Sequence, residues 1–264
     1  MLKKVFLVVS WIALLTGVVF LLGFSSVRQE KTPCSGFDVT IDYQGSDHLL
    51  SARMIRETVN SKFGNPLKQT VSEVNIENIG KHIRNIPSIA KADVFLTIEG
   101  RLVARLVQRK PVMRIINRLG QQYYADAEGA LMPANFDYPA RVIVVNGNIT
   151  FPYSSKVRLT DASAEKAETR QSQLNLYRAF RIVQKAMADS FLIAQVSQLY
   201  LNGENEIEIT PAFGDQLIIF GDTTRADEKF EKLKAFYTQG ISRAGWDTYR
   251  VINLKYENQI ICTK

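Results

Sequence analysis

Near its start the chain carries a run of twenty uncharged and mostly apolar residues, 5–24. A helix of that length rises about 30 Å, which is the thickness of the hydrocarbon core of a bilayer. A cleaved signal peptide is the alternative, with Lys3 and Lys4 as its basic region, but its apolar core normally covers only about 7–15 residues. Because the run is longer and the residues after Gly23 fit a cleavage site poorly, we expect an uncleaved transmembrane helix.

The segments on either side of this run give the expected orientation. Residues 1–4 are predicted to form a cytoplasmic stub, and the residues after 24 are expected to be exported, as is usual for a signal anchor with few preceding residues. A lipid anchor is disfavoured because Thr32 and Pro33 come directly before Cys34. The sequence therefore predicts a single-pass type II protein of the inner (cytoplasmic) membrane.

A polar linker, 25–36, leads into a predicted compact module, 37–110. Alternation of apolar and polar residues over 37–43 predicts a half-buried strand. Two amphipathic helices follow in the prediction, the first capped by Ser51 and the second by Asn75.

The module closes with a predicted hairpin. Residues 91–99 alternate, with Ile98 as the last member of the apolar row, and residues 101–109 form the returning strand. Glu99 and Gly100 are predicted to make the turn between them. The expected order of elements is therefore strand, helix, helix, strand, strand.

Pro111 marks the join to a second block, 111–264, which predicts a mixed sheet with two helices. The first helix is expected over about 164–190, and the second is expected to start at a capping box formed by Thr224 and Asp227. The predicted strands are 112–116, 122–125, 141–145, 196–201, 206–210, 216–220, 248–255 and 259–263.

The charge balance and the cysteine count exclude several classes of protein. The chain has 33 basic and 26 acidic residues, a net charge of +7, and two of the cations precede the apolar run. This mild excess is spread too evenly for a nucleic-acid surface, which needs a clustered stripe. Two cysteines and two histidines are too few for a zinc ribbon.

A search for catalytic motifs finds none, so we expect no enzymatic activity, no metal and no cofactor. His48 is predicted to lie in a solvated turn, and His82 on the exposed face of the second helix. Asp126 and Glu128 could suggest a catalytic carboxylate pair, but a turn accounts for them better. In that turn we expect Gly129 at positive φ and Asp126 accepting hydrogen bonds from nearby backbone N–H groups.

Two features have open alternatives. Cys34 and Cys262 could form a disulfide in an oxidising compartment, or remain two free thiols. A set of basic residues on the hairpin and beyond it either forms a solvated sheet edge, which we favour, or contacts an acidic partner or lipid headgroups. These basic residues are Arg101, Arg105, Arg109, Lys110 and Arg114.

Residues 86–94, 110–114 and 124–132 form three segments that resemble the cell-division protein FtsQ (DivIB) family. Residues 86–94 (Ile-Pro-Ser-Ile-Ala-Lys-Ala-Asp-Val) resemble the segment that opens the second strand of its POTRA module, and 110–114 is similar to its domain junction. Residues 124–132 resemble the Asp-x-x-Gly element of its β domain most closely. Glu99-Gly100 and Gln108 depart from the residues that are frequent in the family.

The resemblance implies an α+β fold with one N-terminal transmembrane helix, a β-α-α-β-β POTRA module, and a mixed, mainly antiparallel β domain with helices. It also implies a non-enzymatic, bitopic scaffold of the division machinery that binds FtsB-like and FtsL-like proteins at the septum, with other division proteins reaching its POTRA module. Two alternatives remain, a membrane-anchored cell-envelope enzyme of the peptidoglycan hydrolase class and a POTRA-containing outer-membrane assembly factor.

The predicted strand pair at residues 249–263 is the candidate binding surface. Its second strand lacks an interior charge, so it is either an ordinary edge blunted by Lys264 or an edge to which a partner adds a strand. The resemblance implies that FtsB docks there. Lys255 is expected to pair with a carboxylate of the partner and Tyr256 to supply contact area. The residues expected to carry the backbone ladder are Asn258, Gln259, Ile260 and Ile261.

Overall fold

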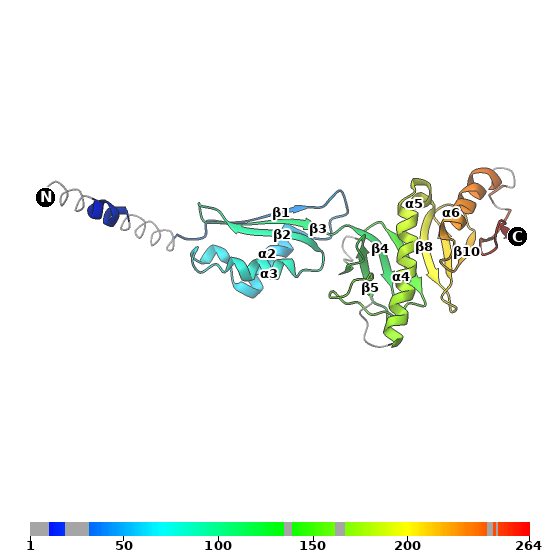
Figure 1. Ribbon diagram of the computed structural model, residues 1–264, viewed down its shortest axis with the longest axis horizontal. Helices are drawn as coiled ribbons and strands as arrows, with labels where there is room; N and C mark the ends of the chain where they lie inside the picture. Colours follow the sequence, from blue (N-terminus) through cyan, green and yellow to red (C-terminus); the bar gives the residue numbers. More distant parts are fainter. Residues whose placement is uncertain (1–10, 19–31, 135–138, 162–166, 242–244, 247) are drawn as a thin grey trace. The chain divides into compact units, whose positions relative to one another are not determined.

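The computed structural model describes residues 11–18, 32–134, 139–161, 167–241, 245–246 and 248–264 (Figure 1). The chain divides into two compact units, which are described separately below. The first consists of Met1–Asp42 with Leu50–Gln108, and the second of Tyr43–Leu49 with Arg109–Lys264.

Most of the predicted transmembrane run, 5–24, lies outside the described residues. Its described portion, 11–18, is helical. Within the part of the chain that the structure describes, no helix has both the length and the apolar character needed to cross a bilayer.

The first unit has the predicted order of strand, helix, helix, strand, strand. A three-stranded sheet with the order β1-β3-β2 packs against two helices, and β1 runs parallel to β3 while β2 and β3 form an antiparallel hairpin. The elements are β1 (Gly36–Asp42), α2 (Ala52–Phe63), a short 3-10 helix η1 (Pro66–Lys68), α3 (Ile76–Arg84), β2 (Ile89–Leu96) and β3 (Arg101–Gln108). Helices α2 and α3 cover one face of the sheet (Figure 1).

Local capping explains where the two helices begin. The Ser51 hydroxyl accepts a hydrogen bond from the N–H of Met54, and the Asn75 side chain accepts one from Asn78. Each cap satisfies a backbone donor that has no partner within its helix. Both predicted caps are therefore confirmed.

The turn of the hairpin corrects one expectation. Strand β2 ends at Leu96, and the N–H of Gly100 donates to the carbonyl of Thr97 to close the turn. Ile98 is consequently not part of the apolar row, and it is 93% exposed. The predicted turn at Gly100 is confirmed, with φ at 76°.

The expectation of a solvated basic edge is wrong for Arg101 and Arg105, because β3 is the central strand of its sheet. The guanidinium of Arg101 binds the Asp38 carboxylate on the neighbouring strand, with N–O distances of 2.7 and 2.9 Å. The guanidinium of Arg105 lies over the ring of Phe95, 5.2 Å from its centroid. Both cations therefore act across the sheet rather than at its margin.

The second unit is a nine-stranded sheet with the order β12-β11-β10-β9-β8-β7-β4-β5-β6. Strand pairs β4–β7, β7–β8 and β10–β11 are parallel, and the other five are antiparallel. The strands are β4 (Pro111–Ile116), β5 (Gln122–Asp126), β6 (Leu131–Pro133), β7 (Ile143–Gly147), β8 (Val196–Leu201), β9 (Ile207–Pro211), β10 (Leu217–Gly221), β11 (Val251–Asn253) and β12 (Ile261–Thr263).

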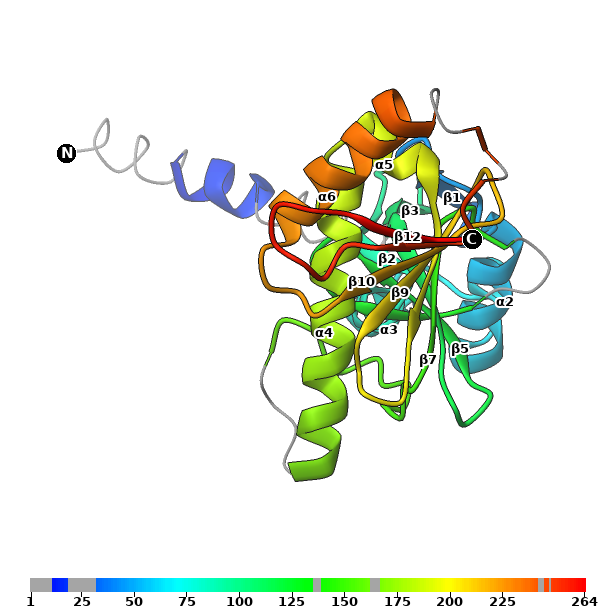
Figure 2. The ribbon, with the colours of Figure 1, turned by 90° about the vertical axis from the view of Figure 1, so that its right-hand side faces the viewer.

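Helices pack on one face of this sheet and form the larger core with it (Figure 2). The helices are α4 (Ala167–Met187), α5 (Ser190–Gln195), α6 (Ala226–Ala235) and a π-helical turn η2 (Phe236–Gly240). Leu176 and Phe180 of α4 and Phe230 and Leu233 of α6 are almost fully buried. Apolar positions at helical spacing on both helices thus face the strands, as predicted.

Several details of the second unit differ from the prediction. Strand β6, helix α5 and the π-helical turn were not expected, and the last two strands contain three residues each instead of eight and five. The capping box is also wrong. The hydroxyl of Thr224 donates to Asp222 instead, and Arg225, at φ 50°, precedes α6 without a side-chain cap.

Candidate partner-binding edge

The last strand, β12, lies at one end of the nine-stranded sheet and has β11 as its neighbour (Figure 2). The two strands are antiparallel, with Ile252 opposite Cys262 and Asn253 opposite Ile261. Strand β11 is itself paired in parallel with β10, which ties the edge to the centre of the sheet. A strand with a single neighbour presents backbone N–H and C=O groups on its other side.

The side chains of β12 alternate between the core and the surface. Ile260, just before the strand, and Cys262 are partly buried and pack against the larger core. Ile261 is 42% exposed, and Thr263 is also exposed. One row of side chains therefore fixes the strand on the unit while the other row faces outward.

The connection between β11 and β12, residues 254–260, is called the terminal turn below. It starts at Leu254, which is fully buried, and contains Asn258 at φ 53°. The ammonium of Lys232 on α6 donates to the carbonyls of Leu254 (3.2 Å) and Tyr256 (2.6 Å). The guanidinium of Arg225 lies 2.6 Å from the Glu257 carboxylate and donates to the carbonyl of Lys255 at 3.4 Å. Cations at both ends of α6 thus hold the main chain of the terminal turn.

Lys255 already has a carboxylate partner within the chain. Its Nζ lies 2.6 and 2.8 Å from the two carboxylate oxygens of Glu206, which directly precedes β9. This hydrogen bond raises the pKa of the Lys255 ammonium. The stem of Lys255 crosses Gly221, where a Cβ would lie 2.7 Å from the Lys255 Cγ. The side chain therefore fastens the terminal turn to the β9 and β10 strands.

Tyr256 is the aromatic residue of the terminal turn, and it is 47% exposed. Its carbonyl is held by Lys232, so the backbone that carries the ring is fixed. A half-exposed ring on a fixed backbone can give contact area with a small loss of conformational entropy.

The predicted site residues are brought together, although few of them lie on a strand. Five of them belong to the terminal turn, namely Lys255, Tyr256, Asn258, Gln259 and Ile260. Only Ile261 of the expected ladder residues is within β12. The paired backbone is centred on residues 261–263, a few residues further along the chain than the sequence indicated.

An aromatic cluster lies beside β11 and was not predicted from the sequence. The rings of Phe236 and Tyr249 are 6.3 Å apart, those of Phe236 and Tyr237 5.9 Å, and those of Tyr237 and Trp246 5.9 Å. Trp246 is 49% exposed. The cluster joins the π-helical turn to the segment before β11, and π-helical turns are frequent at functional sites. The high density of aromatic residues over 236–256 is the feature of the sequence that could have predicted this cluster.

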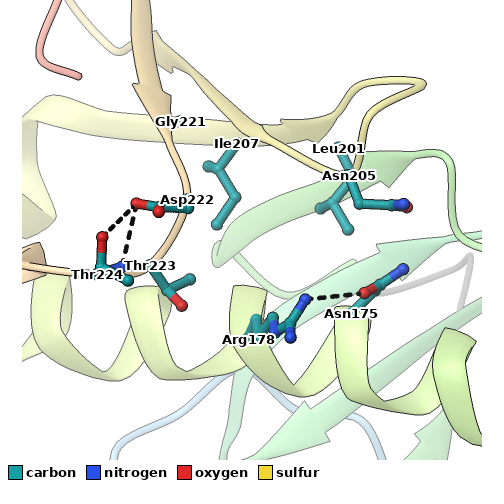
Figure 3. A pocket seen from close by; sticks show the side chains of 9 residues that line it. All are labelled: Asn175, Arg178, Leu201, Asn205, Ile207, Gly221, Asp222, Thr223 and Thr224. Atoms are coloured by element: carbon teal, nitrogen blue, oxygen red, sulfur yellow. Dashed lines mark hydrogen bonds between the residues drawn. The ribbon is translucent and has the colours of Figure 1, made fainter.

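A cavity of about 220 Å³ lies where α4, the β8–β9 turn and the end of β10 meet (Figure 3). The Arg178 guanidinium donates to Asn175 at 3.4 Å on one wall. Opposite, Asp222 accepts hydrogen bonds from Thr224 and from Lys229, and the Lys229 hydrogen bond lowers the pKa of the Asp222 carboxyl. The remaining lining residues are Leu201, Asn205, Ile207, Gly221 and Thr223.

This lining does not form a nucleophile–base pair, because the carboxylate of the cavity is engaged with a lysine and a threonine. Across the described ranges, no group of three His, Cys, Asp or Glu side chains is placed to hold a metal ion.

The turn after β5 behaves as predicted. Gly129 has φ 78°, and one carboxylate oxygen of Asp126 accepts hydrogen bonds from the N–H groups of Glu128 (3.1 Å) and Ala130 (2.7 Å). The other oxygen binds Arg109 at 2.7 Å. Asp126 is therefore a buried structural residue, and Arg109 is its partly buried partner.

The remaining candidates are also structural. His48 stacks on Tyr43 with 3.8 Å between ring centroids and is exposed, as expected. His82 is only partly exposed, contrary to expectation, because its ring meets the edge of Phe63 at 5.5 Å. Burial and the nearby Lys62 ammonium lower the pKa of His82. Cys34 and Cys262 are both free thiols.

Comparison with known proteins gives two family matches. A family model described as FtsQ/DivIB, C-terminal related matches residues 110–263, which is more than half of the chain. A model of a POTRA-like domain matches residues 32–107. A search of curated proteins finds no match.

Proposed function

Since the chain belongs to the FtsQ/DivIB, C-terminal related family, we propose that it is a scaffold of bacterial cell division that captures a bitopic partner protein at the β12 edge. The FtsQ/DivIB family consists of non-enzymatic division scaffolds, and its domains point to that role here. The partners that the family suggests are FtsB-like and FtsL-like proteins, and the place of action is the inner membrane at the division septum. The POTRA-like domain would contact other division proteins there.

The observation that carries the proposal is the construction of the edge. A three-residue strand with one neighbour would fray by itself, because few hydrogen bonds and little buried area hold it. Here two sets of contacts keep the strand in place. Ile260 and Cys262 pack against the core, and the side chains of Arg225 and Lys232 bind the terminal turn. A fixed edge needs no ordering when a partner strand adds to it, which favours binding by β-augmentation.

The side chains around the edge suggest how the partner would be recognised. Ile261 on β12 offers exposed apolar surface, and Tyr256 in the terminal turn offers exposed aromatic surface. Because Lys255 is paired with Glu206, a partner carboxylate would have to share this ammonium or displace Glu206. Backbone pairing with β12 would therefore supply affinity, and Tyr256 and Ile261 would supply selectivity.

Truncation of the edge tests the proposal. A chain truncated after Asn258 lacks β12 but keeps Lys255 and Tyr256, and we expect it to lose capture of the FtsB-like protein from detergent-solubilised membranes. The matched control replaces Thr263 by Val, which keeps the strand, its pairing and its β propensity. Circular dichroism and thermal melting of both variants show whether the two units remain folded. Capture by the folded, truncated chain at wild-type strength would place the docking site elsewhere.

Depletion of the protein from growing cells tests the function as a whole. A division scaffold predicts filaments without septa. Lysis would favour a peptidoglycan hydrolase, and loss of outer-membrane proteins would favour an assembly factor.

A further inference from the structure

The turn between β2 and β3 carries an exposed apolar side chain, although the conformation of the turn does not require an apolar residue there. Ile98 is 93% exposed, the highest value among the large hydrophobic residues that the structure describes. The turn is closed by the hydrogen bond from Gly100 N–H to Thr97 O and by a second one from Arg101 N–H to the Thr97 hydroxyl. The position of Ile98 in such a turn accepts most residue types, and polar ones predominate.

The turn lies at the end of the first unit where the chain arrives from the apolar run. The N–H of Ser35 donates to the carbonyl of Gly100 at 3.0 Å, and the hydroxyl of Ser35 donates to the backbone carbonyl of Glu99 at 3.0 Å. The register of β1 on β3, with Gly36 opposite Arg101, places the start of both strands beside the turn (Figure 1).

A second set of hydrogen bonds holds the arriving chain on its other side. The N–H of Cys34 donates to Gln69, and the N–H of Val71 donates to Thr32, both at 2.9 Å. Leu67, two residues before Gln69, is 51% exposed. The segment 32–35 is therefore fixed between the hairpin turn and residues 69–71, and exposed apolar side chains lie near it.

The distance from this end of the unit to the apolar run is limited by the chain itself. Phe24 closes the run, and Thr32 is the eighth residue after it. Eight residues span at most about 26–29 Å when fully extended. If the run crosses the bilayer, the hairpin turn is kept within that distance of the membrane surface, and Arg28 and Lys31 in the connection favour the headgroup region.

We propose that the Thr97–Gly100 turn docks on the bilayer surface, with the side chain of Ile98 inserted at the level of the lipid headgroups and upper acyl chains. The inference rests on the anchoring of residues 5–24, which belongs to the proposed function. The occupant is a lipid surface because the eight-residue connection keeps the turn within about 26–29 Å of one. The neighbouring Glu99 remains in the aqueous part of the interface, so the contact uses apolar burial rather than attraction to anionic lipids. The contact would hold the POTRA-like domain against the membrane and restrict its orientation.

The chain provides a matched control in its second unit. Leu119 lies at the tip of the β4–β5 turn, which is closed by the hydrogen bond from Gly120 N–H to Asn117 O, and it is 65% exposed. It is an aliphatic residue in a four-residue turn closed by the same kind of hydrogen bond, at the third position of the turn where Ile98 has the second. The chain between it and the apolar run includes the sheet and both helices of the first unit, so no short tether holds it at the membrane.

The experiment uses the full-length protein in vesicles of phosphatidylethanolamine and phosphatidylglycerol whose acyl chains are brominated near the headgroup. Bromine quenches tryptophan on contact, and three single-tryptophan proteins report different positions. The first keeps Trp11 and carries Trp246→Phe, which reports the anchor. The second and third carry Trp11→Phe and Trp246→Phe together with either Ile98→Trp or Leu119→Trp.

We expect the emission of Trp11 and that of the Ile98→Trp protein to be quenched in brominated vesicles relative to plain ones, and the emission of the Leu119→Trp protein to be unchanged. Quenched Trp11 with unquenched Ile98→Trp would overturn the inference and leave the anchor standing. Unquenched Trp11 would overturn the anchor and the inference with it. Equal quenching of Ile98→Trp and Leu119→Trp would show nonspecific adsorption and would also overturn the inference.

Discussion

Tyr256 is the single residue on which the proposed contact with a partner depends most. Its ring is half exposed, while its carbonyl is fixed by Lys232 and the next residue by Arg225. We expect Tyr256→Ala to weaken capture of the FtsB-like protein by about 1–3 kcal/mol, or roughly 5- to 150-fold, as for other aromatic anchors. Titration of the wild-type and variant proteins with the exported segment of the partner measures this loss.

Tyr200 supplies the control for that prediction. It is a tyrosine of similar exposure, 42%, and it lies on β8 in the middle of the sheet. Tyr200→Ala should leave the affinity unchanged. Equal losses for the two substitutions, or no loss for Tyr256→Ala, would mean that the ring of Tyr256 is not part of the interface.

Glycine is required at position 129 because of the backbone conformation there. Its φ of 78° is strained for any residue with a Cβ, and an added Cβ would lie 3.3 Å from Leu159. We expect Gly129→Val to lower the free energy of unfolding by more than about 1 kcal/mol. Urea unfolding measures the change. Gly203→Val is the control, because Gly203 has ordinary φ and open space around it. Equal effects of the two substitutions would argue against backbone strain at Gly129.

At the scale of elements, the connection from β10 to α6 depends on the ion pair between Asp222 and Lys229. The Lys229 side chain is only 3% exposed, and its Nζ lies 2.7 Å from the Asp222 carboxylate and 2.8 Å from the Asp222 carbonyl. Asp222→Asn leaves this buried ammonium without its counter-charge. We expect this substitution to lower the free energy of unfolding at pH 7 by about 1–2 kcal/mol. A larger loss is not expected, because the carboxyl of Asp222 is largely exposed and water screens its charge.

The pH dependence of this effect has a definite sign. Hydrogen bonding to Lys229 places the pKa of Asp222 in the folded protein below its ordinary value. The stabilisation is therefore fully present above the unfolded pKa of about 4 and is lost as the pH falls through the folded pKa. Urea unfolding between pH 7 and pH 3 should show the wild type and Asp222→Asn converging toward low pH. A difference that stays constant would contradict an electrostatic origin.

The elements that could be predicted from the sequence are those specified by local signals. The caps at Ser51 and Asn75, the turns at Gly100 and Gly129, and the apolar faces of the helices all depend on residues within a few positions of one another. The β-α-α-β-β order followed from these signals, and it is confirmed.

The features that sequence reasoning missed depend on long-range contacts. The central place of β3 results from its parallel pairing with β1, some 65 positions earlier in the chain, which no local pattern reveals. The terminal strands are short because Lys232, Arg225 and Glu206 engage residues 254–257 before the ladder can extend. The alternation of apolar and polar residues over 248–255 fits either one long strand or a short strand followed by the terminal turn. The sequence alone therefore could not distinguish the two.

At the scale of the whole molecule, the proposed scaffold acts only if residues 5–24 hold it at the membrane. Leu14 and Leu15 lie at the centre of this run and are exposed on the helix formed by 11–18. An arginine at the centre of a membrane helix costs about 2.5–3.5 kcal/mol on the translocon scale, so two of them offset most of the roughly 4–7 kcal/mol that the remaining apolar residues supply. We expect the Leu14→Arg/Leu15→Arg protein to be lost from the membrane fraction and from division sites, as measured by flotation and by a fluorescent fusion. The control, Leu14→Ile/Leu15→Ile, keeps the hydropathy and should behave as wild type. If the mature wild-type protein is instead found to begin after Gly23 or Ser26, the run is a cleaved signal peptide, and the edge at β12 would have to reach its partner without an anchor.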